Sequence, residues 1–188
     1  MATTSNIKNG SVIFHKNKRM KVVEFLHVKP GKGPAFVRTK IRNLNTGRLL
    51  ENTFTSGVKI DVIRVENRKY QFLYSEGNDY HLMNIDDYEQ IIMQKDFIEH
   101  VQFLKEGENI EVLFHADKGM PLSAQVPSHV VLKISHTEPG IKGNTATNTF
   151  KPAETETGAD IQVPLFINEG DKIKIDTVKG SYIERVKE

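Results

Sequence analysis

The sequence predicts an all-β protein built from small barrels. Apolar and polar residues alternate with a period of two in many short stretches, and turn signals such as Asn9-Gly10 and Pro30-Gly31 separate these stretches. Only residues 84–104 show the spacing of short helices. Many short strands separated by turns are typical of barrels or sandwiches, and not of a parallel sheet with crossover helices.

The expected strands follow one another along the whole chain. In order, they cover residues 11–14, 21–25, 35–44, 70–74, 80–83, 110–115, 129–134, 161–167, 172–176 and 182–186. The stretch between the fifth and sixth predicts one short helical segment, in which Asn84 or Asp86 caps a first turn that reaches Gln90. Asp96 then precedes a second short helix.

The chain length suits three small domains. A chain of 188 residues divides, at boundaries near Val65 and Pro127, into residues 1–65, 66–127 and 128–188. Each part has about 60 residues, which is close to the lower size of domains that fold alone. Small barrels of this size often carry RNA-binding surfaces.

Composition excludes several classes of site. The sequence has no cysteine, so disulfides, thiolate metal sites and cysteine nucleophiles are excluded. Its seven histidines are scattered without the spacing of a zinc site, and we expect neither a metal nor a cofactor. No stretch resembles a signal peptide or approaches the roughly 20 apolar residues of a membrane span. We therefore expect a cytoplasmic protein with no membrane partner.

Positive charge is concentrated at the N-terminal end. Residues 1–65 contain 13 Lys and Arg against three acids, a net charge of +10. Residues 66–127 have a net charge of −7 and residues 128–188 of −1. Chance segregation among solvated faces is the simpler explanation of such asymmetry, but an excess of this size favours a nucleic-acid face in the first segment.

A single lysine, Lys32, stands between two glycines and two prolines: Pro30, Gly31, Gly33 and Pro34. Prolines fix φ and glycines permit tight reversals, so this frame predicts a narrow, projecting hairpin tip. The prolines also restrict the loop before binding, which lowers the entropy that binding costs. An ordinary exposed turn is the alternative, and the basic strand that follows argues against it.

The strand after this tip has two different faces, because alternate residues of a strand share a face. The inward set comprises Ala35, Val37, Thr39 and Ile41. The outward set comprises Phe36, Arg38, Lys40 and Arg42. The three cations of the outward set, named here the cationic stripe, recur about 6.6–7 Å apart, a spacing comparable to successive phosphates. A solvated outer face is the alternative; with Lys29 and Lys32 in the same segment, we favour contact with RNA.

Two long stretches resemble the bacterial elongation factor P family. The first is KPGKGPAFVRTKIRNLNTGRLLENTF, residues 29–54, and the second is TEPGIKGNTATNTFKPAETETGADIQVPLFINEGDKIKIDT, residues 137–177. Both occur in the family's order with the family's spacing, and the resemblance covers nearly the whole chain. It implies three barrels in the L shape of a transfer RNA: an N-terminal KOW (SH3-like) barrel and two OB folds.

The resemblance also implies a function. Family members enter the ribosome between the peptidyl and exit sites when synthesis stalls on consecutive prolines, and a tip lysine, here Lys32, steadies the end of the peptidyl-tRNA. Such a protein assists the reaction of the ribosome and is not an enzyme. It is expected to act as a monomer.

In many members a modifying enzyme extends the tip lysine covalently. The Pro-Gly-Lys-Gly-Pro frame of residues 30–34 resembles a subgroup that works with an unmodified lysine, and we expect the same here.

Further RNA contacts are implied near the C-terminus. The resemblance places a loop that contacts the exit-site mRNA codon at Gly143, Asn144, Thr145 and Ala146. The whole loop, residues 143–148, reads Gly-Asn-Thr-Ala-Thr-Asn, so it lacks the aspartate and the second glycine of the family pattern Gly-Asp-Thr-Ala-Gly-Thr. The resemblance also places Tyr182 and Arg185 near the small subunit and tRNA, while barrel core is the alternative for the tyrosine.

Three other functions remain open for comparison. One is an elongation-factor-P-like paralogue with different target sequences. Another is a general RNA-binding module, which predicts that the cationic stripe matters and Lys32 hardly does. The third is an enzyme with a lysine nucleophile, which an exposed, glycine-rich tip disfavours because it offers no desolvation.

Overall fold

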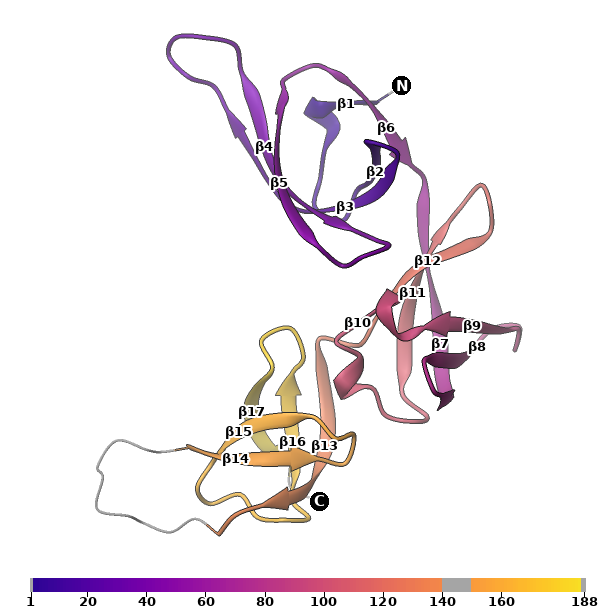
Figure 1. Cartoon of the computed structure of the whole chain (residues 1–188), viewed down its shortest axis with the longest axis vertical. Coiled ribbons are helices and arrows are strands. Elements are labelled where there is room, and N and C mark those ends of the chain that lie inside the picture. The colour runs from indigo at the N-terminus through magenta and orange to yellow at the C-terminus, as the bar shows by residue number, and fades with distance from the viewer. Residues whose placement is uncertain (1, 140–149, 187–188) are drawn as a thin grey trace. The chain divides into compact units, whose positions relative to one another are not determined.

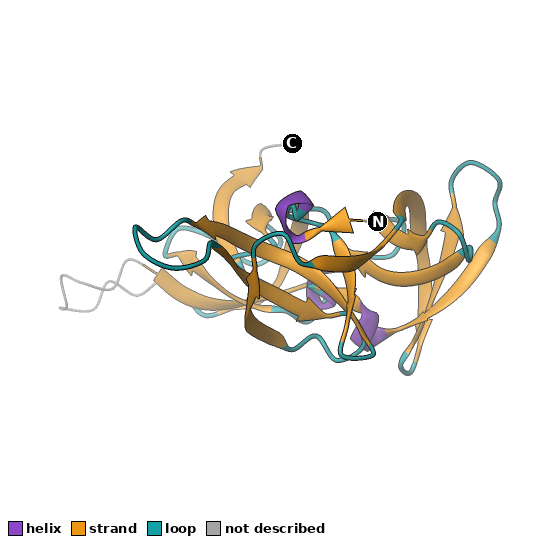
Figure 2. Ribbon diagram, turned by 90° about the horizontal axis from the view of Figure 1, so that it is seen from above, coloured by secondary structure: helices purple, strands orange, loops and turns teal. Residues whose placement is uncertain are grey.

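The computed structural model describes residues 2–139 and 150–186 (Figure 1). Almost all regular structure in this part of the chain is β-strand (Figure 2). Helical structure there is limited to three short 3-10 turns: η1 (Thr4–Asn6), η2 (Lys95–Phe97) and η3 (Val101–Phe103). The all-β class predicted from the sequence is confirmed.

The strands form three sheets, and the chain forms two compact units. The first unit comprises residues 1–68, 94–97 and 112–124, and the second comprises residues 69–93, 98–111 and 125–188. The sheets lie within residues 2–63, 65–125 and 129–186. The three-domain division with boundaries near Val65 and Pro127 stays a prediction.

The first sheet is a curled, antiparallel sheet of six strands. Its order is β1 (Ala2–Thr3), β6 (Lys59–Ile63), β2 (Val12–His15), β3 (Lys18–Val28), β4 (Phe36–Asn43) and β5 (Leu49–Thr55). The hydroxyl of Thr4 donates a 2.9 Å hydrogen bond to the carbonyl of Thr55, which joins the two edges of the curl. Closure of this kind leaves little free strand edge.

Two apolar clusters fill the first unit. Inside the curl, Ile7, which follows η1, packs with inward side chains of β2, β3 and β4: Ile13, Met20, Val22 and Ile41. The second cluster lies beyond the sheet, where Val12 and Leu44 pack with Leu122 from residues 112–124 of the same unit. Each of these buried side chains contributes roughly 1.5–3 kcal/mol relative to an exposed one.

The second sheet also has six strands. Its order is β10 (Ile98–Glu99), β12 (Met120–Gln125), β11 (Asn109–His115), β7 (Val65–Glu76), β8 (Asp79–Asn84) and β9 (Gln90–Gln94). The predicted hairpin of Tyr70–Tyr74 with Tyr80–Met83 is the antiparallel pair β7–β8. Its buried face includes Tyr70, Phe72 and Leu82, each at most 3% exposed.

The helices expected in residues 84–104 do not form, and that prediction was wrong. Residues 90–94 are strand β9, and only η2 and η3 have helical turns. Tyr88 and His100 have φ values of 63° and 62°, which a right-handed helix cannot contain. The β-branched pair Ile91-Ile92 also suits a pleated edge strand better than a helix. No helix among the described residues is long and apolar enough to cross a membrane.

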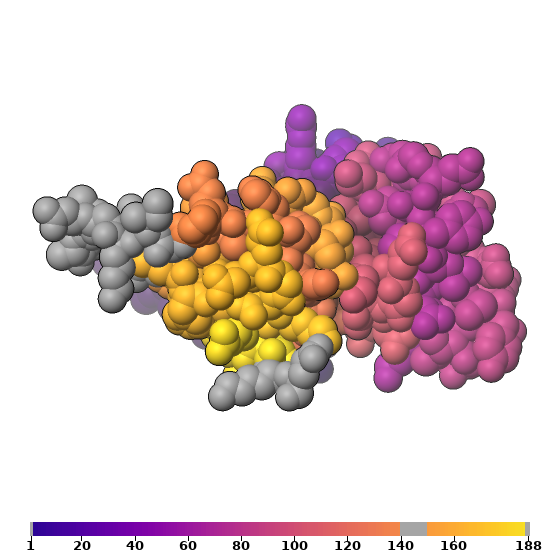
Figure 3. Space-filling view, turned by 90° about the horizontal axis from the view of Figure 1, so that it is seen from below, coloured from indigo at the N-terminus to yellow at the C-terminus, as the bar shows by residue number. Residues whose placement is uncertain are grey.

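The third sheet has five antiparallel strands. Its order is β15 (Asp160–Pro164), β14 (Phe150–Thr155), β13 (His129–Thr137), β16 (Lys172–Asp176) and β17 (Ser181–Val186). Val163, Ile167 and Ile173 are fully buried in its core. The packed side chains of this sheet form a continuous surface, coloured orange to yellow in Figure 3.

Within the second unit, the β14–β15 turn is tied to the segment around η3. The hydroxyl of Thr157 donates a 2.7 Å hydrogen bond to the carbonyl of Gln102. One carboxylate oxygen of Glu156 accepts 3.0 Å hydrogen bonds from the Lys105 ammonium and from the Lys133 amide. Partial burial raises the pKa of Glu156, but these two donors outweigh it and hold the pKa below its ordinary value.

Candidate nucleic-acid interface

Strands β3 and β4 form a hairpin with a long loop at its end (Figure 1). Lys32 lies in this loop. Strand β3 ends at Val28 and β4 begins at Phe36, and residues 29–34 between them are all exposed. Among the described residues, none forms an ion pair or hydrogen bond with the Lys32 ammonium. This ammonium is therefore available to a molecule outside the chain.

The two glycines beside Lys32 have different roles in the backbone. Gly33 has a φ of 104°, a conformation that L side chains rarely adopt. Gly31 does not lie in that region, and a Cβ atom placed at either glycine meets no atom within 4 Å. The fold of the free chain thus explains the glycine at position 33 and does not require the one at position 31.

The cationic stripe lies on the outer face of β4, as the alternation predicted. Val37, Thr39 and Ile41 are at most 1% exposed, so this face of the strand points into the core. On the other face, Arg38 is exposed, while Lys40 and Arg42 are half-buried. Val28 of β3 and Thr55 of β5 flank Phe36, the uncharged residue that precedes the stripe on this face.

Two acids interrupt the stripe, which the linear sequence did not indicate. In the sheet register, Glu24 on β3 and Glu51 on β5 are the two neighbours of Lys40. The Lys40 ammonium lies 3.9 Å from the Glu24 carboxylate. The neighbours of Arg38 are the uncharged Leu26 and Thr53. The positive charge of Arg38 is therefore less compensated by neighbouring acids than the charge of Lys40.

Arg185 of β17 lies beside an exposed aromatic ring. Its guanidinium is 5.9 Å from the centre of the Phe166 ring and 3.8 Å from the Asp171 carboxylate. Phe166 is 59% exposed, which suits stacking on an unpaired base. The sequence alone does not indicate Phe166, because its contact with Arg185 joins residues 19 positions apart and no periodicity marks it. Tyr182 is half-buried and pairs with Ile175 of β16.

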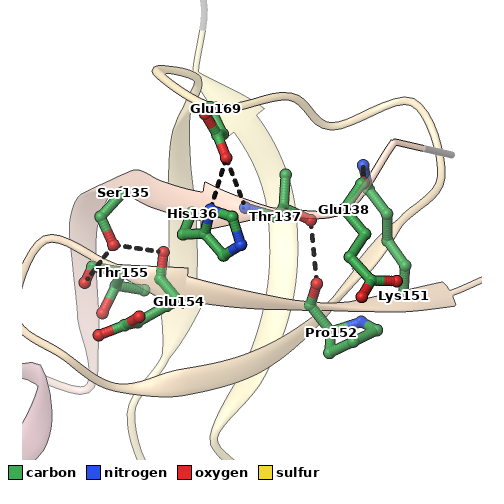
Figure 4. A network of polar contacts seen from close by, with 9 residues as sticks. All are labelled: Ser135, His136, Thr137, Glu138, Lys151, Pro152, Glu154, Thr155 and Glu169. Carbon is green, nitrogen blue, oxygen red and sulfur yellow. Dashed lines mark hydrogen bonds and ion pairs between the residues drawn. The ribbon is translucent and has the colours of Figure 1, made fainter.

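The predicted codon-contacting residues Gly143, Asn144, Thr145 and Ala146 lie outside the described residues. The strands on either side of them are joined by a polar network (Figure 4). The Lys151 ammonium donates to the Glu138 carbonyl over 2.6 Å, and the Thr137 hydroxyl donates to the Pro152 carbonyl over 2.9 Å.

Glu169 supports the same strand end from another segment. Its carboxylate accepts a 3.2 Å hydrogen bond from the Thr137 amide and lies 2.7 Å from Nδ1 of the His136 ring (Figure 4). The end of β13 is therefore held from two sides. Among the described residues, no three His, Asp or Glu side chains gather as a metal site.

Three regions of the chain match models of one protein family. Residues 3–60 match the KOW-like domain of elongation factor P, residues 65–123 its OB domain, and residues 130–185 its C-terminal domain.

Whole proteins give the same result. The chain is 55% identical to elongation factor P of Christiangramia forsetii and 56% identical to that of Flavobacterium johnsoniae, and each match covers all of both chains. It is 52% identical, again over all of both chains, to elongation factor P 1 of Porphyromonas gingivalis. A solved structure, eukaryotic translation initiation factor 5A from Methanococcus jannaschii, is similar with a TM-score of 0.51 at 20% identity. That match covers 66% of this chain and 90% of the other, and it bears on the fold alone.

Proposed function

Because the chain belongs to the elongation factor P family of non-enzymatic translation factors, we propose that it relieves ribosomes stalled at consecutive prolines. It binds between the peptidyl and exit sites and positions peptidyl-tRNA for bond formation. Lys32 at the hairpin tip is the effector.

The observation that carries this proposal is the exposure of Lys32 in the loop at the end of the β3–β4 hairpin. Proline is a constrained secondary amine, so stalled bond formation at prolines is a failure of positioning that correct alignment relieves. A lysine ammonium can donate three hydrogen bonds to the tRNA backbone without taking part in acid–base chemistry. The prolines of the loop lower the entropy lost when the tip becomes fixed.

Other parts of the chain supply the remaining contacts. We assign the tRNA and ribosomal RNA contacts of the first sheet to Lys29 and the cationic stripe. The contacts of the third sheet fall to Tyr182 and Arg185, and the exit-site codon is contacted by residues 143–146. The protein acts in the cytoplasm as a monomer, and the stiff frame around Lys32 removes the need for a covalent extension.

The test is reconstituted translation of a reporter with consecutive prolines, using recombinant, unmodified protein. Relief of the pause by the wild type and not by Lys32→Ala is the expected result. Lys59→Ala is the matched control, because Lys59 is an exposed lysine of the same sheet away from the tip. A reporter without prolines should respond to none of the proteins.

The rival functions give different results in the same assay. A general RNA-binding module predicts that Arg38→Ala reduces activity while Lys32→Ala does not. A paralogue with other targets predicts relief on other stalling sequences and none on consecutive prolines. If no protein relieves the pause, the mass of the Lys32 peptide from the native host distinguishes a missing modification from a wrong function.

A further inference from the structure

The outer face of β3, β4 and β5 contains a cavity of about 220 Å³ beside the cationic stripe. The residues that line it include two carboxylates, two cations and an apolar side chain: Glu24, Glu51, Arg38, Lys40 and Leu26. Pockets that enclose whole small ligands measure about 300–1,000 Å³, so this cavity suits part of a ligand, such as one base of a nucleotide.

The carboxylates of this cavity oppose the binding of phosphate. Glu24 and Glu51 are two of the three acids in residues 1–65, yet both lie next to the central cation of the stripe. Like charges at short range are unfavourable, so a surface that only gripped phosphates would bind better without them. One carboxylate is enough to neutralise the charge of Lys40, so this role explains at most one of the two acids.

Lys40 is paired with Glu24, so the carboxylate of Glu51 is available to bind a ligand. The Lys40 ammonium lies 3.9 Å from Glu24, and no cation of the described chain lies within ion-pair distance of Glu51. Neighbouring strands are about 4.8 Å apart, so the backbones that carry Glu24 and Glu51 are separated by about 10 Å. The Lys40 side chain shares this space, and the cavity beside it leaves room for a flat ring.

The chemistry of the lining discriminates between bases. A carboxylate accepts hydrogen bonds from the exocyclic amino group of cytosine, adenine or guanine, whereas uracil presents a carbonyl oxygen in the equivalent place. Leu26 is 58% exposed and provides an apolar wall for the ring. Arg38 stands directly across from Leu26 and can hold the phosphate of the same nucleotide.

We propose that this cavity binds an unpaired nucleotide whose base carries an exocyclic amino group, with Glu51 as the residue that recognises the amino group. The inference rests on the proposed RNA contact of the cationic stripe. If the site exists, this part of the stripe selects a base in addition to binding phosphate.

The test compares oligocytidylate with oligouridylate of equal length as probes of the full-length protein at low salt. The wild type should bind oligocytidylate roughly three- to tenfold more tightly, the effect of one hydrogen bond to a charged acceptor at an exposed site. Glu51→Gln should weaken binding of oligocytidylate and strengthen binding of oligouridylate. Asp61→Asn is the matched control, because it removes the third acid of residues 1–65, which is exposed on β6.

If Glu51 recognises the base, Glu51→Gln changes the affinities for the two probes in opposite directions. Loss of simple charge repulsion would instead raise both affinities by the same factor. A uniform rise in Glu51→Gln overturns the proposal, as does equal affinity, or no affinity, of the wild type for both probes. The proposal would also be overturned if the control variant Asp61→Asn changed the two affinities in the same way as Glu51→Gln.

Failure here is distinct from failure of the proposed function. A wild type that relieves proline pauses but shows no base preference contradicts only the nucleotide site. A protein with the base preference but no pause relief contradicts only the translation function.

Discussion

The buried ammonium of Lys151 donates a 2.6 Å hydrogen bond to the backbone carbonyl of Glu138. Lys151 is 6% exposed, and a buried ammonium is costly unless a partner compensates its charge. The bond joins the beginning of β14 to the residue after β13, where the two strands leave the described part of the chain (Figure 4). Lys151 thus has a structural role, although lysine is rarely buried.

Lys151→Met is expected to destabilise the protein by about 1–3 kcal/mol. The substitution keeps the length of the side chain but leaves the Glu138 carbonyl without its donor. Urea unfolding at neutral pH measures the effect. The matched control is Lys174→Met, which removes an exposed 3.3 Å pair with Glu184 and should cost less than about 0.5 kcal/mol. Equal losses in the two variants would contradict the assigned role of Lys151.

Glu156 predicts an acid-dependent loss of stability. Its pKa is lowered in the folded protein by the Lys133 amide and the Lys105 ammonium, against the effect of partial burial. A lowered folded pKa stabilises the fold at pH values above the unfolded pKa of about 4.3, and the contribution disappears as the pH falls through the folded pKa.

We therefore expect Glu156→Gln to lower the free energy of unfolding by about 0.5–1 kcal/mol at pH 7 and by less at pH 3. Urea unfolding of both proteins at the two pH values provides the measurement. Glu154→Gln changes an exposed acid on β14, two residues before Glu156, and should show no such pH dependence. The mechanism would be contradicted if the free energies of unfolding of wild type and Glu156→Gln differed more at pH 3 than at pH 7.

The two tip glycines predict different effects of alanine. Gly33→Ala forces a side chain into a φ of 104° and should strain the loop by up to about 1–2 kcal/mol. Gly31→Ala should leave the melting temperature unchanged, because neither backbone nor space requires glycine there in the free chain. If the tip enters a confined site, Gly31→Ala should nevertheless reduce pause relief. Full activity of Gly31→Ala would show that the site tolerates a methyl group.

The neighbours of the cationic stripe predict unequal contributions to RNA binding. Arg38→Ala should weaken binding to ribosomes more than Lys40→Ala, because Glu24 and Glu51 flank only the lysine. Affinity should be measured over a series of salt concentrations. For Arg38→Ala, the slope of log affinity against log salt concentration should fall in magnitude by about one, because one phosphate contact is lost. A larger loss for Lys40→Ala would place the phosphate on the lysine instead.

Local pattern was sufficient for much of the fold. Strict alternation in residues 35–44 predicted β4 and its buried face, since one face of a strand must be apolar wherever it covers a core. The pattern was weak for β5, β6, β9, β12 and β14, and the two-residue strands β1 and β10 are too short to show one, so none of these strands was predicted. In residues 84–104, polar caps and spaced apolar residues imitate a helix start, while left-handed backbone at Tyr88 and His100 produces turns.

The sequence by itself determined the all-β class, the tip with Lys32, the outward cations of β4 and the resemblance to the family, because each depends on neighbours along the chain. Tertiary structure alone decided that Glu24 and Glu51 flank Lys40, that Phe166 lies beside Arg185, and that Lys105 meets Glu156. These contacts join residues that the linear order separates by up to 51 positions. Their pairing follows from strand register and from the packing of turns, which no local periodicity encodes.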